Sequence, residues 1–288
     1  MTNLSNEEKQ TQSTDQETIE KNKSLDQYPF YINQLKERKF SVEKSPPNLR
    51  YVLTKVNGDK NMVGIASKGE IVVVYGPPKS RKSTLLSCIV ASAFVNEPNY
   101  TLDFHMNLSK DENILFIDTE MPFTSFYRRQ MLLNKMCGSK HIDISTLHAY
   151  SLKPFSPGER VDQIEYLIET TPNLGLVVID QIADLVPDIN DRESVLELYS
   201  RVSRWTDSTG AILLTSIHVT RGTEYMTGVL GHEFSKKMDS GFFITKDSLT
   251  KRSKVTHLIA REQDVDDFLF SHNEWGEPEY VGFNSSHF

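Results

Sequence analysis

One short segment of the chain combines the groups that proteins use to bind phosphate. The segment GPPKSRKST (76–84) follows an apolar, β-branched run at 71–75 and precedes an apolar stretch long enough for a helix. A strand, a loop and a helix in this order, with Lys-Ser at the end of the loop, are typical of a phosphate-binding P-loop. Such a loop surrounds phosphate oxygens with backbone N–H groups and with the N-terminus of its helix. The residues expected to bind a nucleotide here are Gly76, Pro77, Pro78, Lys79, Ser80, Arg81, Lys82, Ser83 and Thr84.

The last residues of this loop have individual predicted roles. Lys82 is expected to contact the β- and γ-phosphates, and the Ser83 hydroxyl to ligate Mg²⁺, with Thr84 supporting it. Arg81 stands where the strict pattern G-x-x-x-x-G-K-[ST] has its second glycine. A left-handed backbone there would cost arginine about 1–2 kcal/mol, whereas an outward-pointing side chain would do no harm. The alternative to a nucleotide site is a basic loop that opens an ordinary βα unit.

Carboxylates follow two further apolar runs. Asp180 ends LGLVVID (174–180), which has the form of a Walker B strand, whose carboxylate organises Mg²⁺ and its water shell. Glu120 follows ILFID (114–118), where a carboxylate can polarise an attacking water as a general base. Taken singly, Asp180 also suits a cap or turn, and Glu120 a solvated position. Together with the P-loop they predict a site for ATP and Mg²⁺.

A fourth apolar run, AILLTSI (211–217), completes the pattern that predicts the fold. It ends in Ser216 and His218, where a polar side chain can sense the γ-phosphate, although a lone histidine near a strand end is more often structural. Continuous apolar strands that alternate with amphipathic helices predict an α/β fold, a mostly parallel sheet with helices on both faces. Ligands bind at the carboxyl ends of strands in such sheets, where all these residues fall. The clearest helices are expected at 123–136, after the Ser156-Pro157-Gly158-Glu159 start, and at 191–206.

Composition limits the classes of protein that fit. With 288 residues and 38% hydrophobic content, the chain suits one large α/β domain with appendages. A formal net charge of −7 argues against a generally basic nucleic-acid-binding surface. Nucleic acid would then have to bind at a local basic loop or in a channel formed by several subunits. Two cysteines exclude a disulfide framework, and Cys88 is expected to be a buried thiol. We expect no signal peptide, no membrane association and a cytoplasmic location.

The sequence divides into three expected parts. Residues 1–27 have too few apolar side chains to offset the entropy of ordering and are expected to be a disordered tail. Residues 28–46 form an N-terminal extension, and residues 47–288 the ATPase domain. Within that domain, the polar stretch 96–113 is expected to be an exposed, irregular loop. Two adjacent arginines of the 123–136 helix, Arg128 and Arg129, are interpreted as solvated charges, and His257 and His272 carry no legible pattern.

The motifs together resemble the RecA-like P-loop ATPases, the class that includes RecA, KaiC and the DnaB helicases. In particular the chain is similar to the RepA-like ATPases of plasmids, phages and mobile elements. The resemblance covers about residues 47–280 and is strongest in GPPKSRKST, ILFIDTE, LVVIDQIADLV and ILLTSIHVTR. It implies a RecA-like core, and it implies that Glu120, one strand away from the P-loop, is the catalytic base. Gln181 follows Asp180, so the chain does not resemble AAA+ proteins with a paired Asp-Glu.

The resemblance also implies partners. It suggests a homo-oligomer, a hexameric ring or a filament, in which the 218–237 loop faces a central channel and contacts single-stranded DNA. The cations of this loop that could contact phosphates are Arg221, Lys236 and Lys237. Arg261 resembles the arginine finger that reaches a neighbouring subunit's γ-phosphate. The alternatives are a solvated loop, and a surface ion pair of Arg261 with Glu262 or Asp264.

Three functions are compatible with these features. The leading hypothesis is an oligomeric, DNA-associated ATPase of RepA-like helicase or recombinase type. The second, which rests on Arg81, is an ATP-binding switch that controls assembly without efficient hydrolysis. The third is a signalling ATPase of KaiC type that does not act on DNA.

Overall fold

The computed structural model describes residues 35–36, 38–39, 51–138, 144–261 and 263–283. The chain divides into two compact units, residues 1–49 and 50–288. The predicted tail and most of the predicted N-terminal extension lie outside the described residues. A search of the described helices finds none with the length and apolar character needed to cross a bilayer.

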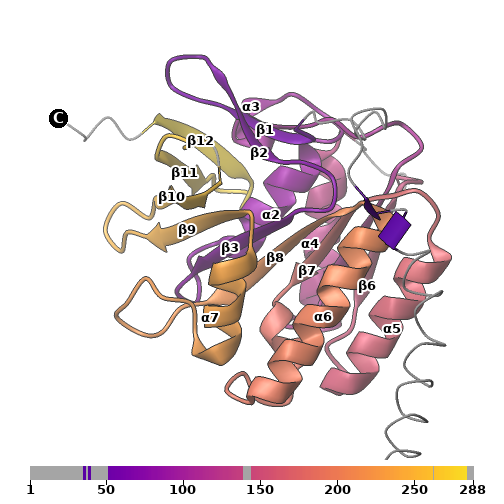
Figure 1. Cartoon of the computed structure of the whole chain (residues 1–288). Coiled ribbons are helices and arrows are strands. Elements are labelled where there is room, and N and C mark those ends of the chain that lie inside the picture. Colours follow the sequence, from indigo (N-terminus) through magenta and orange to yellow (C-terminus); the bar gives the residue numbers. More distant parts are fainter. Residues whose placement is uncertain (1–34, 37, 40–50, 139–143, 262, 284–288) are drawn as a thin grey trace, which may run out of the picture. The chain divides into compact units, whose positions relative to one another are not determined.

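Among the described residues, one large sheet holds nine strands in the order β12-β11-β10-β9-β3-β8-β7-β5-β6 (Figure 1). From β9 to β6 every neighbouring pair is parallel, while β10, β11 and β12 pair antiparallel at one edge. The strands are β3 (Ile71–Gly76), β5 (Asn113–Asp118), β6 (Leu147–Ser151), β7 (Leu174–Asp180), β8 (Ile212–His218), β9 (Ser240–Lys246), β10 (Ser253–Ala260), β11 (Phe268–His272) and β12 (Pro278–Phe283).

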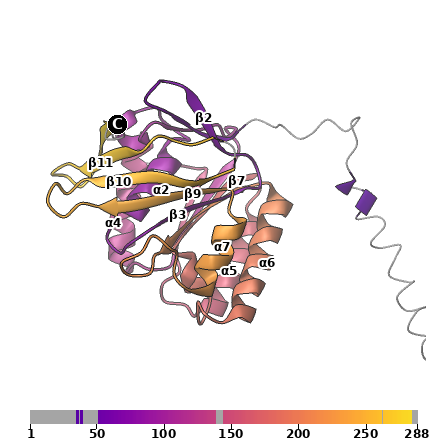
Figure 2. The same cartoon turned by 60° about the vertical axis from the view of Figure 1, so that its left-hand side comes forward.

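Helices cover both faces of this sheet, as Figures 1 and 2 show. On one face, α2 (Lys82–Ala91) and α4 (Phe123–Met136) contribute to one hydrophobic cluster. On the other, α5 (Pro157–Thr170), α6 (Arg192–Thr209) and α7 (Gly228–Lys237) contribute to a second cluster. Because both faces are covered, β3 and β7 are buried along their whole length, which explains their continuous apolar sequences. The predicted fold class is confirmed.

Local sequence signals fix several helix ends. At the start of α5, the Ser156 side chain accepts from the Glu159 amide and the Glu159 carboxylate accepts from the Ser156 amide, which is the predicted capping box. Asp191 caps α6 by accepting from the Ser194 amide, and Gly210 ends the helix with a left-handed φ of 68°. These helices thus begin and end close to the predicted residues.

The prediction of an irregular loop at 96–113 is wrong. The segment contains a short helix, α3 (Pro98–Thr101), and a strand, β4 (Phe104–Met106). β4 pairs with β1 (Leu53–Val56), which also pairs with β2 (Met62–Ala66), to give a three-stranded antiparallel sheet. The strand forms in polar surroundings because Phe104 is fully buried, with its ring edge-on to Phe242 and Phe268.

The predicted 218–237 loop also needs correction, because its second half is helix α7 and only residues 219–227 connect β8 to it. Leu230 and Phe234 are fully buried in the second hydrophobic cluster, and the Phe234 ring packs edge-on against Tyr199 of α6. This burial stabilises a helix in a sequence whose two glycines and short apolar pattern gave little local sign of one.

Candidate functional site

The P-loop begins where β3 emerges between two parallel neighbours, β8 and β9. Gly76 is the last residue of β3, and a Cβ there would collide with the carbonyl oxygen of Ile244 on β9. Only glycine fits this close approach of two backbones. The contact with β9 therefore fixes where the loop leaves the sheet, and the loop then leads to the start of α2 at Lys82.

Arg81 adopts the left-handed conformation that the missing glycine would have adopted. Its φ is 80° and its ψ 31°, and it is the N-cap residue of α2, without a side-chain cap. Lys79, with a φ of 64°, is also left-handed. The conformation costs Arg81 about 1–2 kcal/mol relative to glycine. Its guanidinium Nη1 lies 3.5 Å from the hydroxyl of Ser253, the first residue of β10.

A pocket of about 400 Å³ opens above this loop, at the carboxyl ends of the strands. Residues that follow four strand ends meet there, among them the predicted Lys82, Ser83, Glu120, Asp180 and His218. The complete lining is Pro78, Lys79, Arg81, Lys82, Ser83, Thr84, Glu120, Met121, Arg129, Asp180, His218 and His272. The remaining predicted P-loop residues, Gly76, Pro77 and Ser80, shape the loop without lining this pocket.

Lys82 holds its ammonium group at the base of the pocket. Its Nζ donates to the carbonyl oxygens of Gly76 and Pro77, at 3.0 and 3.2 Å, and to Nδ1 of His218 at 2.8 Å. Burial lowers the Lys82 pKa to about 8, against the opposing charges of Asp180 and Glu120. Burial and the Lys82 charge also lower the pKa of His218. A phosphate would supply the anionic partner that this lysine lacks.

Asp180 is held in place on both of its oxygens. The Ser216 hydroxyl donates to Oδ1 at 2.8 Å, and Nη1 of Arg129 donates to Oδ2 at 2.8 Å. The register of β5 and β7 sets Asp118 directly beside Asp180. Burial, reinforced by the Asp180 charge, raises the Asp118 pKa to about 6.

These residues fit a Mg²⁺ ion that is held mainly by nucleotide and water. Asp118 Oδ2 is buried without a hydrogen-bond partner next to Asp180. A cation bound at these two carboxylates would therefore compensate negative charge that the protein leaves only partly compensated. Ser83 lies in the same pocket. Across the described residues, no group of three or more His, Cys, Asp or Glu side chains is arranged to hold a metal. Mg²⁺ is usually held by one or two protein oxygens together with substrate phosphates, so the hydroxyl of Ser83 and the carboxylate of Asp180 are ligands of the right kind for it.

Glu120 lies at the open side of the pocket. Its side chain is exposed, its amide donates to Asp118 Oδ1, and its carbonyl accepts from Lys153 Nζ at 2.7 Å. The backbone is thus fixed while the carboxylate is left in contact with solvent. A carboxylate so placed can take a proton from a water molecule in the pocket.

Arg261 lies near the start of β3, at the end of the strand opposite to the pocket. Its Nη1 is 2.9 Å from Oδ1 of Asp239, whose Oδ2 accepts from the amide of Ile71 at the start of β3. Asp239 is an ion-pair partner that the sequence did not suggest. Within one chain Arg261 is therefore remote from the pocket, and its action on a neighbouring subunit stays a prediction.

The structure adds residues that sequence reasoning missed. Arg129, interpreted as solvated, instead contacts Asp180. His272, at the end of β11, places Nε2 3.1 Å from the Thr84 hydroxyl, and burial lowers its pKa to about 4, with Arg81 nearby adding to the effect. No sequence signal links His272 to a loop 188 positions earlier. For Arg129, the helix that starts directly after Glu120 was the available clue.

The cations predicted to meet DNA have different environments. Arg221 is exposed in the 219–227 connection. Lys236 and Lys237 lie in the last turn of α7, both in ion pairs with Glu233, and Lys237 Nζ lies 3.9 Å from the ring centre of Tyr199.

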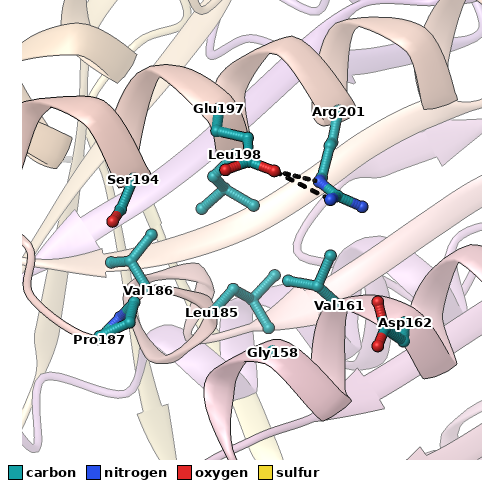
Figure 3. A pocket seen from close by; sticks show the side chains of 10 residues that line it. All are labelled: Gly158, Val161, Asp162, Leu185, Val186, Pro187, Ser194, Glu197, Leu198 and Arg201. Atoms are coloured by element: carbon teal, nitrogen blue, oxygen red, sulfur yellow. Dashed lines mark hydrogen bonds and ion pairs between the residues drawn. The ribbon is translucent and has the colours of Figure 1, made fainter.

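A second hollow, of about 210 Å³, lies between α5, the 3-10 helix η1 (Ile182–Leu185) and α6. Figure 3 shows apolar side chains such as Val161, Leu185 and Leu198 lining it, and Arg201 ion-paired with Glu197 at its rim. None of the predicted site residues lines this hollow. Most of them line the pocket above the P-loop instead.

Fold and pocket together define an α/β protein of the P-loop nucleotide-binding class. A family model described as "AAA domain" matches residues 55–224, more than half of the chain, and the chain belongs to this family. It is therefore a P-loop ATPase of AAA/RecA-like type, and the resemblance noted from the motifs is confirmed at that level. No curated protein matches the chain.

Proposed function

We propose that this chain binds ATP with Mg²⁺ above the P-loop and hydrolyses the bond between the β- and γ-phosphates. The observation that carries the proposal is the meeting of Lys82, Glu120, Asp180 and His218 in one pocket. They supply a phosphate-binding cation, a base, a metal-organising carboxylate and a polar sensor, which together are the parts that phosphoryl transfer to water requires.

Each residue has a separate task in this mechanism. Lys82 exchanges its carbonyl partners for the β- and γ-phosphates, and the α2 N-terminus binds phosphate through its amides. Ser83 and Asp180 would hold a Mg²⁺ ion, which would neutralise phosphate charge. Glu120 orients the attacking water and accepts its proton. His218 is hydrogen-bonded to Lys82, and it loses this hydrogen bond when Lys82 moves to the γ-phosphate.

We further propose that the chain works as an oligomer on DNA, as a helicase or recombinase of RepA-like type. The motif resemblance supports this, and so does the exposed Arg221 beside α7. Arg261 of one subunit would stabilise the transition state in its neighbour. Phosphate loss would shift the 219–227 connection and α7, which follow directly from His218.

A nucleotide-binding switch with weak or no hydrolysis is the second candidate, either controlling assembly or signalling in the manner of KaiC. The left-handed Arg81 favours it, because a large side chain at this point of the loop can hold the phosphates away from the geometry of hydrolysis.

ATPase rates with and without single-stranded DNA distinguish these functions. Glu120→Gln is expected to lower turnover about 100-fold or more while ATP still binds, and Lys82→Ala is expected to lose ATP binding. DNA-stimulated turnover that disappears in both variants supports the motor. Tight ATP binding without turnover, unchanged by Glu120→Gln, would instead establish the switch.

Salt-dependent DNA binding tests the DNA role separately. Arg221→Ala and the double variant Lys236→Ala with Lys237→Ala are expected to weaken binding and to lower its salt dependence. Binding that is absent at low salt in the wild type would leave a signalling ATPase.

A further inference from the structure

Arg129 places a guanidinium directly over the acidic end of the pocket. Its Nη1 lies 2.8 Å from Asp180 Oδ2 and 4.0 Å from Asp118 Oδ2. Both carboxylates are buried, whereas the Arg129 side chain is 26% exposed and lines the pocket. The guanidinium thus contacts Asp180 Oδ2 within the lining of the pocket.

The acid pair has only part of the compensation that two buried carboxylates need. Asp118 Oδ1 accepts from the amides of Glu120 and Met121, but Oδ2 has no hydrogen-bond partner. The lysine of the site, Lys82, directs its donors to carbonyl oxygens and His218 instead. Arg129 is therefore the cation in direct contact with Asp180, at the place where a divalent ion would be expected.

We propose that Arg129 is a nucleotide-binding residue that exchanges partners when ATP binds. In the nucleotide-free chain it takes the Asp180 oxygen that a divalent cation needs, and it leaves for the terminal phosphate of incoming ATP. Guanidinium groups bind phosphate oxygens in a bidentate manner, so the exchange replaces one charge-assisted pair by another. Metal access to Asp180 is thereby coupled to nucleotide binding. This inference rests on the proposed ATP site.

The first experiment uses a divalent ion without nucleotide. Thermal unfolding of the full chain is followed against MnCl₂ concentration for the wild type, Arg129→Gln and the matched control Arg128→Gln, whose side chain on the same helix is exposed. Arg129→Gln is expected to be stabilised at Mn²⁺ concentrations about tenfold lower than the other two, because nothing competes for Asp180. Identical responses of the two variants overturn the proposal.

The second experiment uses nucleotide without a divalent ion. Binding of fluorescent ATP and ADP analogues in EDTA is compared for the same three proteins. Arg129→Gln is expected to bind ATP about tenfold more weakly, with little change for ADP, since the guanidinium contacts the terminal phosphate of ATP. Equal losses for ATP and ADP, or no loss, contradict the exchange.

Two further variants separate the possible failures. If Arg129→Gln does not fold, Arg129→Lys keeps a cation near the acids but loses bidentate geometry, and the same loss of ATP binding in EDTA is expected. Lys82→Ala tests the ATP site itself. A wild type that binds no ATP refutes the proposed function, while the Mn²⁺ measurement still decides whether Arg129 and a divalent ion compete for Asp180.

Discussion

Among the residues that the structure describes, two lysines are buried, and their surroundings differ. Lys55 on β1 is 0% exposed and Lys82 on the P-loop is 7% exposed. Burial lowers the pKa of Lys55 to about 7 and that of Lys82 to about 8. Lys55 Nζ donates to the Leu102 carbonyl at 2.6 Å and lies 4.2–5.5 Å from four ring centres. The rings belong to Phe104, Phe268, Tyr280 and Phe283.

The difference shows that a lowered pKa alone does not identify a functional site. The rings around Lys55 shield it from solvent. They also connect the three-stranded sheet that contains β1 with the hairpin of β11 and β12. Lys82 has two carbonyls and a histidine as partners, each of which a phosphate can replace, and it opens on a pocket. Burial lowers the pKa in both places, but only the second lysine is accessible to a ligand.

Removing the enclosed lysine should have the largest effect, on stability. Lys55→Ala leaves a cavity among aromatic rings and an unpaired Leu102 carbonyl, so the free energy of unfolding should fall by about 3–4 kcal/mol. Lys55→Met fills most of the volume and should cost far less. Urea denaturation of both variants measures this, and equal losses would show that packing is not what the side chain contributes.

A matched substitution at the open lysine should affect binding instead. Lys82→Met is expected to weaken ATP binding about 100-fold, or about 2.7 kcal/mol, because the charge-assisted contact to phosphate is lost. Lys55→Met should keep the wild-type affinity within a factor of two or so. Titration with a fluorescent ATP analogue compares them, and a similar loss in both variants would remove the contrast.

The pH dependence of stability should report the enclosed lysine. Its pKa is about 7 in the folded chain against 10.5 ordinarily, so between these values the unfolded chain binds a proton that the folded chain does not. The contribution of Lys55 to the free energy of unfolding should therefore rise with pH across this window, by up to about 1.4 kcal/mol per unit. Below about pH 7 the full penalty of burying the ammonium is present.

Lys55→Met is the control for that prediction. The contribution of Lys82 is common to both proteins, so the difference between wild type and Lys55→Met should grow in favour of the wild type from pH 7 to pH 10. Urea unfolding at several pH values measures it. Parallel profiles would mean that Lys55 is not the titrating group.

The smallest effect is expected at the strained residue of the P-loop. Arg81→Gly relieves a left-handed backbone worth about 1–2 kcal/mol but adds about 0.5–1 kcal/mol of unfolded-state entropy. Stability should rise by about 1 kcal/mol or less, whereas Arg81→Ala should keep the strain. If Arg81 limits hydrolysis, Arg81→Gly should also raise the ATPase rate, and an unchanged rate would weaken the switch hypothesis.

Features written in local sequence could be predicted for this molecule. The bounds of α4 and β7 agree with the expected 123–136 and 174–180, and the capping box of α5 is present. Buried strands have continuous apolar runs, and helix ends have capping residues, so both can be predicted from the local sequence. The residues at the strand ends could also be placed near the P-loop, because carboxyl ends of parallel strands meet at one edge.

Features that depend on distant partners could not be predicted. β4 forms because Phe104 finds rings from β9 and β11, and α7 forms because Phe234 packs on α6. The sequence around an arginine on a helix does not show whether its side chain faces water or, like that of Arg129, a buried carboxylate. His272 reaches the site only through the pairing of β11 with β10.

The position of β9 beside β3 has a consequence for the synthesis of the protein. The P-loop strand is made early, but its second neighbour in the sheet comes much later, and His272 follows Thr84 by 188 positions. At about 5–20 residues per second, a ribosome takes roughly 10–40 s to cover that interval. For most of this time both edges of the P-loop strand are uncovered, because β8 and β9 begin only at residues 212 and 240, and the pocket above the loop is unfinished.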